Sequence, residues 1–198
     1  MTAGTAVAAD LTAIRQYLQE HDIRYVVFDM DLTVTSEHSG GMLLKMDRMT
    51  LFSYMDSARD TDALAVIQLC AELGIRMGVA TFQKEVDDAA HVGGTPLVRQ
   101  ALQRLGIDAI EEGSIVALTR EEYKVMVTNQ DTYNKNDMLR TLFERWGVEF
   151  DPTHTLLVDD TVRNIRAFAS IGGHGLAIHG HSGMQLDNVT FVSPASAT

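Results

Sequence analysis

The chain has 198 residues, which suits one domain with a full core or one domain with a modest insertion. Its formal net charge of −11 disfavours non-specific binding to nucleic acid, because that binding needs Lys and Arg to meet phosphates. A single cysteine excludes an internal disulfide. Since the sequence shows neither a secretory signal pattern nor an apolar run near the ~20 residues that span a bilayer, we expect a cytoplasmic protein without membrane contact.

Strand-like and helical patterns alternate along the chain with short connections. We predict helices at 10–21, 60–74, 95–106, 134–147 and 161–172, and strands at 23–29, 75–81, 107–112, 114–119, 153–160, 173–179 and 188–193. Asp10, Thr95 and Asn134 are the expected N-caps of three helices. The segment 36–57 contains Met and Gly and has no clean period, so we predict a loop or flap there.

This alternation predicts a doubly wound α/β fold, a Rossmann-like three-layer sandwich with a mostly parallel central sheet and no large cap domain. Residues 1–198 form a single domain in this prediction, with the core at about 23–178 and an edge strand near the end. In such a fold the functional site lies beyond the carboxyl ends of the strands. The residues that follow each strand are therefore the candidates for function.

Acidic side chains follow two of the predicted strands. "VVFDMDLTVT" places Asp29 and Asp31 after the first, and "LLVDD" places Asp159 and Asp160 at the end of a later one. Residues two apart on a strand point the same way, so Asp29 and Asp31 address one site. Either pair alone also fits a helix cap or a turn. Four carboxylates in one cleft repel each other unless a cation offsets them, and Mg²⁺ is the economical counter-charge.

Two further residues bear on the same edge of the sheet. Thr81 ends the strand "MGVAT", where its hydroxyl can donate to an anion, although a threonine is also ordinary at a strand end. Lys135 starts a helix, where the macrodipole disfavours a cation by up to about 1 kcal/mol. A nearby carboxylate or phosphate removes that conflict, and a solvated surface lysine explains the placement equally well. Lys124 competes for the same role but lies in the strand-like "EEYKVMV".

Taken in order, these motifs resemble the haloacid dehalogenase (HAD) superfamily of aspartate-nucleophile phosphatases, in a minimal-cap or capless form. The resemblance rests on "VVFDMDLTVT", Thr81, Lys135 and "LLVDDTVRNI", and it covers nearly the whole chain. It implies that Asp29 attacks phosphorus and forms an aspartyl-phosphate. It also implies that Asp31 protonates the leaving oxygen and later takes a proton from the attacking water. The dehalogenase branch lacks an acid at the position of Asp31, so its presence favours phosphoryl transfer.

The resemblance implies that Thr81 and Lys135 hold the phosphoryl oxygens, and that Mg²⁺ is the cofactor. The metal ligands it implies are the carboxylates of Asp29 and Asp160 and the backbone carbonyl of Asp31. Asp159 would lie behind and orient Lys135 or a metal-bound water. The choice between Asp159 and Asp160 as direct ligand stays open, and the family's single-acid variants favour Asp160. Asn164 and Thr33 are expected to support the acids from nearby positions.

Caps inserted between the motifs usually select the substrate in this superfamily. Here 52 positions separate Asp29 from Thr81 and 54 separate Thr81 from Lys135, which leaves room for at most a small β insertion at about 113–127. An open site suits a phosphoprotein, for example one with phosphotyrosine, or another bulky phosphate ester. In the flap, "SEHSGGM" offers His38 and Ser39 as substrate contacts, although each also fits an ordinary polar loop.

The leading hypothesis is thus a Mg²⁺-dependent phosphatase that acts on phosphate monoesters. A phosphotransferase or phosphomutase of the same superfamily differs only in what accepts the phosphoryl group. A receiver-type phospho-acceptor signalling module also uses Asp, Thr and Lys around Mg²⁺, but it carries the acceptor on a later strand. The expected partners are a phosphorylated substrate and Mg²⁺, without nucleic acid or membrane, and the sequence does not define the oligomeric state.

Overall fold

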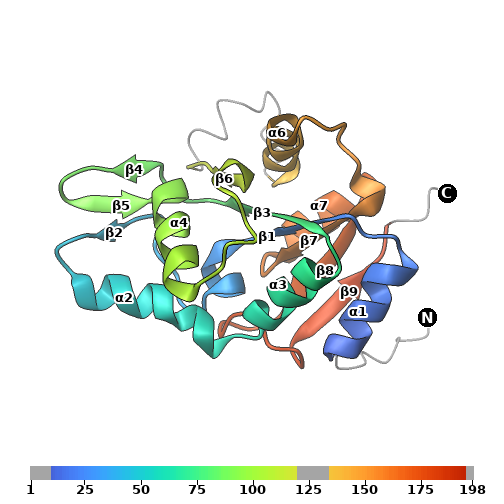
Figure 1. Cartoon of the computed structure of the whole chain (residues 1–198), viewed down its shortest axis with the longest axis horizontal. Helices are drawn as coiled ribbons and strands as arrows, with labels where there is room; N and C mark the ends of the chain where they lie inside the picture. Colours follow the sequence, from blue (N-terminus) through green and yellow to red (C-terminus); the bar gives the residue numbers. More distant parts are fainter. Residues whose placement is uncertain (1–9, 120–133, 195–198) are drawn as a thin grey trace.

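A six-stranded sheet lies at the centre of the structure, a computed structural model that describes residues 10–119 and 134–194 (Figure 1). In spatial order its strands are β6 (Ile115–Ala117), β3 (Arg76–Thr81), β1 (Tyr25–Phe28), β7 (Thr155–Asp159), β8 (His174–Ile178) and β9 (Val189–Val192). Neighbouring strands are parallel, except that β9 runs antiparallel to β8. The mostly parallel sheet and the edge strand at 188–193 are confirmed.

Helices cover both faces of this sheet. One face packs against α1 (Leu11–Glu20), α3 (Ala63–Glu72) and α4 (Gly94–Leu105), and the other packs against α6 (Asn136–Trp146) and α7 (Val162–Ala169). Strand β1 shows why the sequence builds three layers. Val26 and Phe28 belong to the first core and Val27 to the second, because successive side chains of a strand point to opposite faces. The predicted Rossmann-like three-layer sandwich is confirmed.

Helix α6 lies close against the sheet and carries Lys135 at its N-cap. The buried side chains of α6 follow a helical period and are Met138, Leu139, Leu142, Phe143 and Trp146. A Cβ at Gly78 of β3 would lie 2.9 Å from the Ser114 carbonyl oxygen and 3.0 Å from the Trp146 ring. The absence of a side chain at this position therefore lets the helix approach the strand.

The segment predicted as a loop or flap at 36–57 contains regular structure. It holds β2 (Leu43–Leu44) and α2 (Arg48–Asp56). Strand β2 joins β5 (His91–Gly93) and β4 (Val86–Asp87) in a small antiparallel sheet. Figure 1 shows this small sheet and α2 beside each other at one end of the molecule. The protein thus has a small β unit, but it is built from segments on either side of α3 and lies outside the predicted 113–127 region.

The sequence of α2 hides its helical period. Asp47 caps the helix, since its Oδ1 accepts a hydrogen bond from the Thr50 N–H at 3.0 Å, and three side chains of α2 are buried. Two apolar side chains of α2 remain exposed, Met49 at 83% and Phe52 at 42%. Because apolar side chains occupy both the buried and the exposed faces, the pattern gave no amphipathic signal.

Other expectations need correction. Residues 107–112 form no strand: Gly106 ends α4 in the left-handed region, and the Ile107 N–H bonds the Leu102 carbonyl in a turn. Gly93, and not Thr95, is the N-cap of α4. Within the predicted β insertion at 113–127, residues 115–117 form β6, an edge strand of the central sheet, and positions 120–127, which include Lys124, lie outside the described residues.

Two features of the described residues concern membranes and thiol chemistry. Within 10–119 and 134–194, no helix combines the length and the apolar character needed to cross a bilayer.

Cys70 of α3 is buried, and burial raises the pKa of its thiol to about 12. The thiol therefore stays protonated near neutral pH, which agrees with its expected role as a core residue.

Candidate active site

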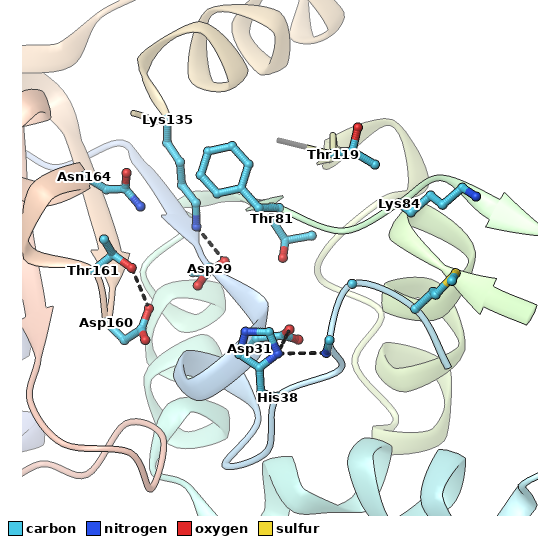
Figure 2. Close-up of a pocket in the computed structure, with 14 residues that line it drawn as sticks. Asp29, Asp31, His38, Thr81, Lys84, Thr119, Lys135, Asp160, Thr161 and Asn164 are labelled. Atoms are coloured by element: carbon cyan, nitrogen blue, oxygen red, sulfur yellow. Dashed lines mark hydrogen bonds and ion pairs between the residues drawn. The ribbon is translucent and has the colours of Figure 1, made fainter. Parts of the chain in front are cut away.

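A cavity of about 560 Å³ lies where three central strands end (Figure 2). Asp29 follows β1, Thr81 ends β3 and Asp160 follows β7, while Lys135 reaches in from the start of α6. Parallel strands present their carboxyl ends at one edge of the sheet, so residues far apart in sequence meet there. The structure thus brings together the predicted Asp, Thr and Lys residues in one place.

Lys135 makes the closest contacts in this cavity. Its Nζ lies 2.5 Å from Asp29 Oδ1 and 2.8 Å from Asp159 Oδ2, and the side chain is 1% exposed. Burial alone would lower the pKa of Lys135, but the carboxylates of Asp159 and Asp29 outweigh that effect and hold it above its ordinary value. The ammonium is therefore charged, and the conflict with the macrodipole of α6 is offset by two carboxylates.

Asp29 is buried in a site with an excess of negative charge. Burial raises the pKa of Asp29 to about 8, and Asp159 and Asp160 add to this increase while Lys135 opposes it. Oxygen atoms of the three carboxylates lie within 4.8 Å of one another. One ammonium does not balance three carboxylates, and carboxylate oxygens are the ligands that a hard divalent cation prefers. The residues present therefore fit Mg²⁺.

The two acids at the end of β7, Asp159 within the strand and Asp160 just after it, have different surroundings. Asp159 is fully buried and accepts hydrogen bonds from the Thr161 N–H at 2.8 Å and from Asn164 Nδ2 at 3.0 and 3.1 Å. Asp160 lines the cavity and accepts from Thr161 Oγ1 at 3.3 Å. Partial burial and the charge of Asp159 raise the pKa of Asp160. Asp159 thus lies behind the site against Lys135 and Asn164, and Asp160 faces the cavity.

Asp31 lines the same cavity but has other partners. Its Oδ2 accepts from the Ser39 N–H at 3.0 Å and Ser39 Oγ at 2.7 Å. Its Oδ1 accepts from the Tyr54 hydroxyl at 2.5 Å and Gln83 Nε2 at 2.7 Å. Ser39 was expected to contact substrate, but it is buried and holds Asp31. His38 does line the cavity, and its Nδ1 lies 3.3 Å from Asp31 Oδ2.

Sequence reasoning missed several of these residues. Tyr54 lies on the unpredicted helix α2, so nothing in the pattern marked it. Gln83 and Lys84 follow Thr81 directly, and their place just after a strand was the signal that could have found them. Lys84 lines the cavity as an exposed cation. Thr33 was expected to support Asp31, but the hydrogen bonds to the Asp31 carboxylate come from the other residues described above.

Phe82, which also lines the cavity, flanks Lys135, whose Nζ lies 5.7 Å from the centre of the Phe82 ring. The remaining lining residues come from the loop before β2, the end of the described segment after β6, the turn after β7 and the first turn of α7; they are Gly40, Gly41, Met42, Thr119, Thr161 and Asn164. Figure 2 shows the polar side chains gathered around the end of β1. The cavity therefore combines polar groups around the end of β1 with apolar surface, to which Met42 and Phe82 contribute.

Comparisons with known proteins support the fold and give no information about the function. No family model matches the chain, and no curated protein matches it. A solved structure titled "Structure of DsGPDH of Dunaliella salina" is similar with 12% identity and a TM-score of 0.51, over 91% of this chain and 28% of that one. An uncharacterized protein from Listeria monocytogenes serotype 4b is similar with 14% identity and a TM-score of 0.50, over 87% and 88% of the two chains.

A third similar structure is 3-deoxy-D-manno-octulosonate 8-phosphate phosphatase from Moraxella catarrhalis, solved in complex with magnesium ion, phosphate ion and KDO molecule. It shares 17% identity with a TM-score of 0.38, over 80% of this chain and 68% of that one. This chain spans less than a third of the length of the Dunaliella protein. At these identities the first two likenesses show a shared α/β fold, and the third carries no argument about function.

Proposed function

We propose that this protein is a Mg²⁺-dependent phosphatase that hydrolyses phosphate monoesters through an aspartyl-phosphate at Asp29. The observation that carries the proposal is the surroundings of Asp29. Its carboxylate contacts the buried Lys135 and lines the cavity, and together with the carboxylates of Asp159 and Asp160 it forms a cluster that fits a divalent cation. The resemblance of the motifs to the HAD superfamily supports the same reading.

In the first step an Asp29 oxygen bonds to phosphorus while the bond from phosphorus to the leaving oxygen breaks. Asp31 gives its proton to the leaving oxygen. In the second step a water oxygen bonds to phosphorus, Asp31 takes the proton from that water, and the bond between Asp29 and phosphorus breaks. Inorganic phosphate leaves, and both carboxyl groups return to their starting states.

The other residues of the site act on charge and orientation. The Lys135 ammonium lies beside Asp29 and would donate to phosphoryl oxygens, together with the Thr81 hydroxyl. The residues that would hold Mg²⁺ are Asp29 and Asp160, with the Asp31 backbone carbonyl, and Asp159 would fix Lys135 from behind. When bound, Mg²⁺ would supply positive charge between the anionic nucleophile and the anionic phosphate.

For the substrate we propose a bulky phosphate ester, such as a protein phosphotyrosine. Among residues 10–119 and 134–194, the segments outside the central sandwich amount to α2 and the small sheet, and this unit lies beside the cavity without a separate cap domain. The Met42 and Phe82 side chains offer apolar surface next to the polar centre. An aromatic leaving group would fit that combination.

The test is the hydrolysis of an aryl phosphate by the purified full chain, with Mg²⁺ and with EDTA. We expect Asp29→Asn to lower kcat by about 10³-fold or more, because the nucleophile is lost. Asp108→Asn, at an exposed carboxylate in the loop after α4, is the matched control and should keep full activity. Full activity of Asp29→Asn, or equal rates in Mg²⁺ and EDTA, would overturn the proposal. A panel of phosphopeptides, sugar phosphates and nucleotides then tests the substrate class.

A further inference from the structure

The buried Asp31 carboxylate accepts hydrogen bonds from protein groups on both of its oxygens. Each of its oxygens accepts two hydrogen bonds, from Ser39 on Oδ2 and from Tyr54 and Gln83 on Oδ1. Tyr54 and Gln83 are 1% and 0% exposed, so their polar groups have been taken out of water. Burying such groups is costly unless they are paired, and the Tyr54 hydroxyl and Gln83 Nε2 both find their acceptor in the Asp31 carboxylate.

The hydrogens of this network can be assigned. Gln83 Nε2 lies 2.7 Å from Asp31 Oδ1 and 3.0 Å from the Tyr54 hydroxyl, so its two hydrogens serve both acceptors. The Tyr54 hydroxyl accepts from Gln83, and its own proton points to Asp31 Oδ1. Burial and the neighbouring Asp31 charge raise the pKa of the Tyr54 phenol well above its ordinary value, so it remains a donor.

The two oxygens of Asp31 therefore differ. Oδ1 faces the buried pair Tyr54 and Gln83, whereas Oδ2 lies near His38, which lines the cavity (Figure 2). A carboxyl group anchored through Oδ1 keeps Oδ2 directed toward the cavity. The Ser39 hydroxyl can donate to Oδ2 when Asp31 is ionised and accept from it when Asp31 is protonated, because a hydroxyl does both.

We infer that Tyr54, with Gln83, is a positioning residue that aims Asp31 Oδ2 at the leaving oxygen of the substrate. This inference rests on the proposed function. The proton passes from Oδ2 to the leaving oxygen as its bond to phosphorus breaks, and Oδ2 receives a proton from the water in the second step. Through Tyr54, helix α2, which lies outside the central sheet, takes part in positioning the proton donor.

The experiment uses Tyr54→Phe in the full chain with Mg²⁺, and two substrates that differ in their leaving groups. Phenyl phosphate needs a proton on its leaving oxygen, whereas 2,4-dinitrophenyl phosphate releases a stable phenolate and needs none. We expect kcat for phenyl phosphate to fall about 10- to 100-fold, because an error of about 1 Å in aim costs about that much. For 2,4-dinitrophenyl phosphate the fall should stay within about 3-fold, with KM unchanged for both.

Two comparisons separate positioning from a general loss of structure. Asp31→Asn should show the same dependence on the leaving group, and the double variant Tyr54→Phe/Asp31→Asn should be no slower than Asp31→Asn alone, because both changes remove one function. Tyr17→Phe is the matched control. It removes a phenol hydroxyl that hydrogen-bonds His174 Nδ1 at 2.9 Å in another part of the fold, and it should leave kcat unchanged for both substrates.

The outcomes are distinct for the two ideas. Equal losses on both substrates in Tyr54→Phe, or losses that multiply in the double variant, would show that Tyr54 is only structural and overturn the inference while leaving the phosphatase proposal intact. A wild-type protein that hydrolyses neither substrate in Mg²⁺ would overturn the proposed function, and the inference with it.

Discussion

Asp29 and Asp31 are two residues apart and equally buried, each 8% exposed, but their neighbours are of opposite kinds. Asp29 faces the Lys135 ammonium and shares an acidic group with Asp159 and Asp160. Asp31 faces neutral hydrogen-bond donors from three separate segments of the chain. One cavity therefore has an ionic half and a neutral half.

This difference predicts which half of the cavity responds to a bound cation. The ionic half has more negative than positive charge, and burial, with a further contribution from Asp159 and Asp160, raises the pKa of Asp29, so a bound cation would favour its ionised form. The neutral half needs no such partner, because four donors already stabilise the Asp31 carboxylate. Ligands should therefore act on the stability of the ionic half and leave the neutral half unchanged.

The largest effect is expected from removing the charge of the ionic half. Lys135→Met leaves two buried carboxylates without their counter-charge, and it should lower the free energy of unfolding by about 3–5 kcal/mol. Urea titration measures this loss. It should be larger near pH 8 than near pH 5, because Asp29 carries a proton at the lower pH. Lys84→Met, at the exposed lysine of the same cavity, should stay within about 0.5 kcal/mol of wild type. Equal stabilities of the two variants would contradict an ionic half.

The pH dependence of the metal-free protein should follow Asp29. Its pKa rises from an ordinary 3.8 to about 8 in the fold, so between these values the folded state binds more protons than the unfolded state. The contribution of Asp29 to the free energy of unfolding therefore falls as the pH increases from about 4 to about 8. Urea titrations in EDTA across this range, with Asp29→Asn as the reference, measure it.

Mg²⁺ should offset that decline, since a bound cation favours the ionised carboxylate. At a concentration 100 times its Kd it should add about 2.7 kcal/mol near pH 8. Asp160→Asn should lose most of this increment. If the free energy of unfolding in EDTA had the same pH dependence in wild type and in Asp29→Asn, the assignment of that dependence to Asp29 would be wrong.

The sequence predicted the acids of the ionic half and Asp31 itself, but not the hydrogen-bond donors around Asp31, and the reason is physical. Asp29, Thr81, Asp159 and Asp160 follow from the alternation of strands and helices, because a parallel sheet places the ends of its strands together. Lys135 was marked by its conflict with the helix dipole, which left a solvated lysine equally open, and the resemblance to the HAD motifs favoured the site. Each of these signals is local and can be read from a short window of sequence.

The neutral half depends on packing between distant segments. Tyr54 reaches Asp31 because α2 forms and buries one face, and the exposed apolar residues Met49 and Phe52 concealed the helical pattern in the sequence. Ser39 was predicted as a substrate contact, but its burial against Asp31 depends on the path of the loop. Propensity and period describe single elements, so contacts that arise when two elements pack lie beyond them.

The smallest effect is expected in the neutral half. Ser39→Ala removes the hydroxyl bond to Asp31 Oδ2 but keeps the backbone N–H bond, so the free energy of unfolding should fall by about 1–2 kcal/mol. Ser53→Ala, which removes an exposed hydroxyl bond to Glu37, is the control and should change it by less than about 0.5 kcal/mol. Because the Asp31 side chain is not part of the acidic group of Asp29, Mg²⁺ should stabilise Ser39→Ala as much as wild type. Loss of the Mg²⁺ increment in Ser39→Ala would show that the two halves are coupled, and that the metal depends on the orientation of Asp31 as well as on the acids around Lys135.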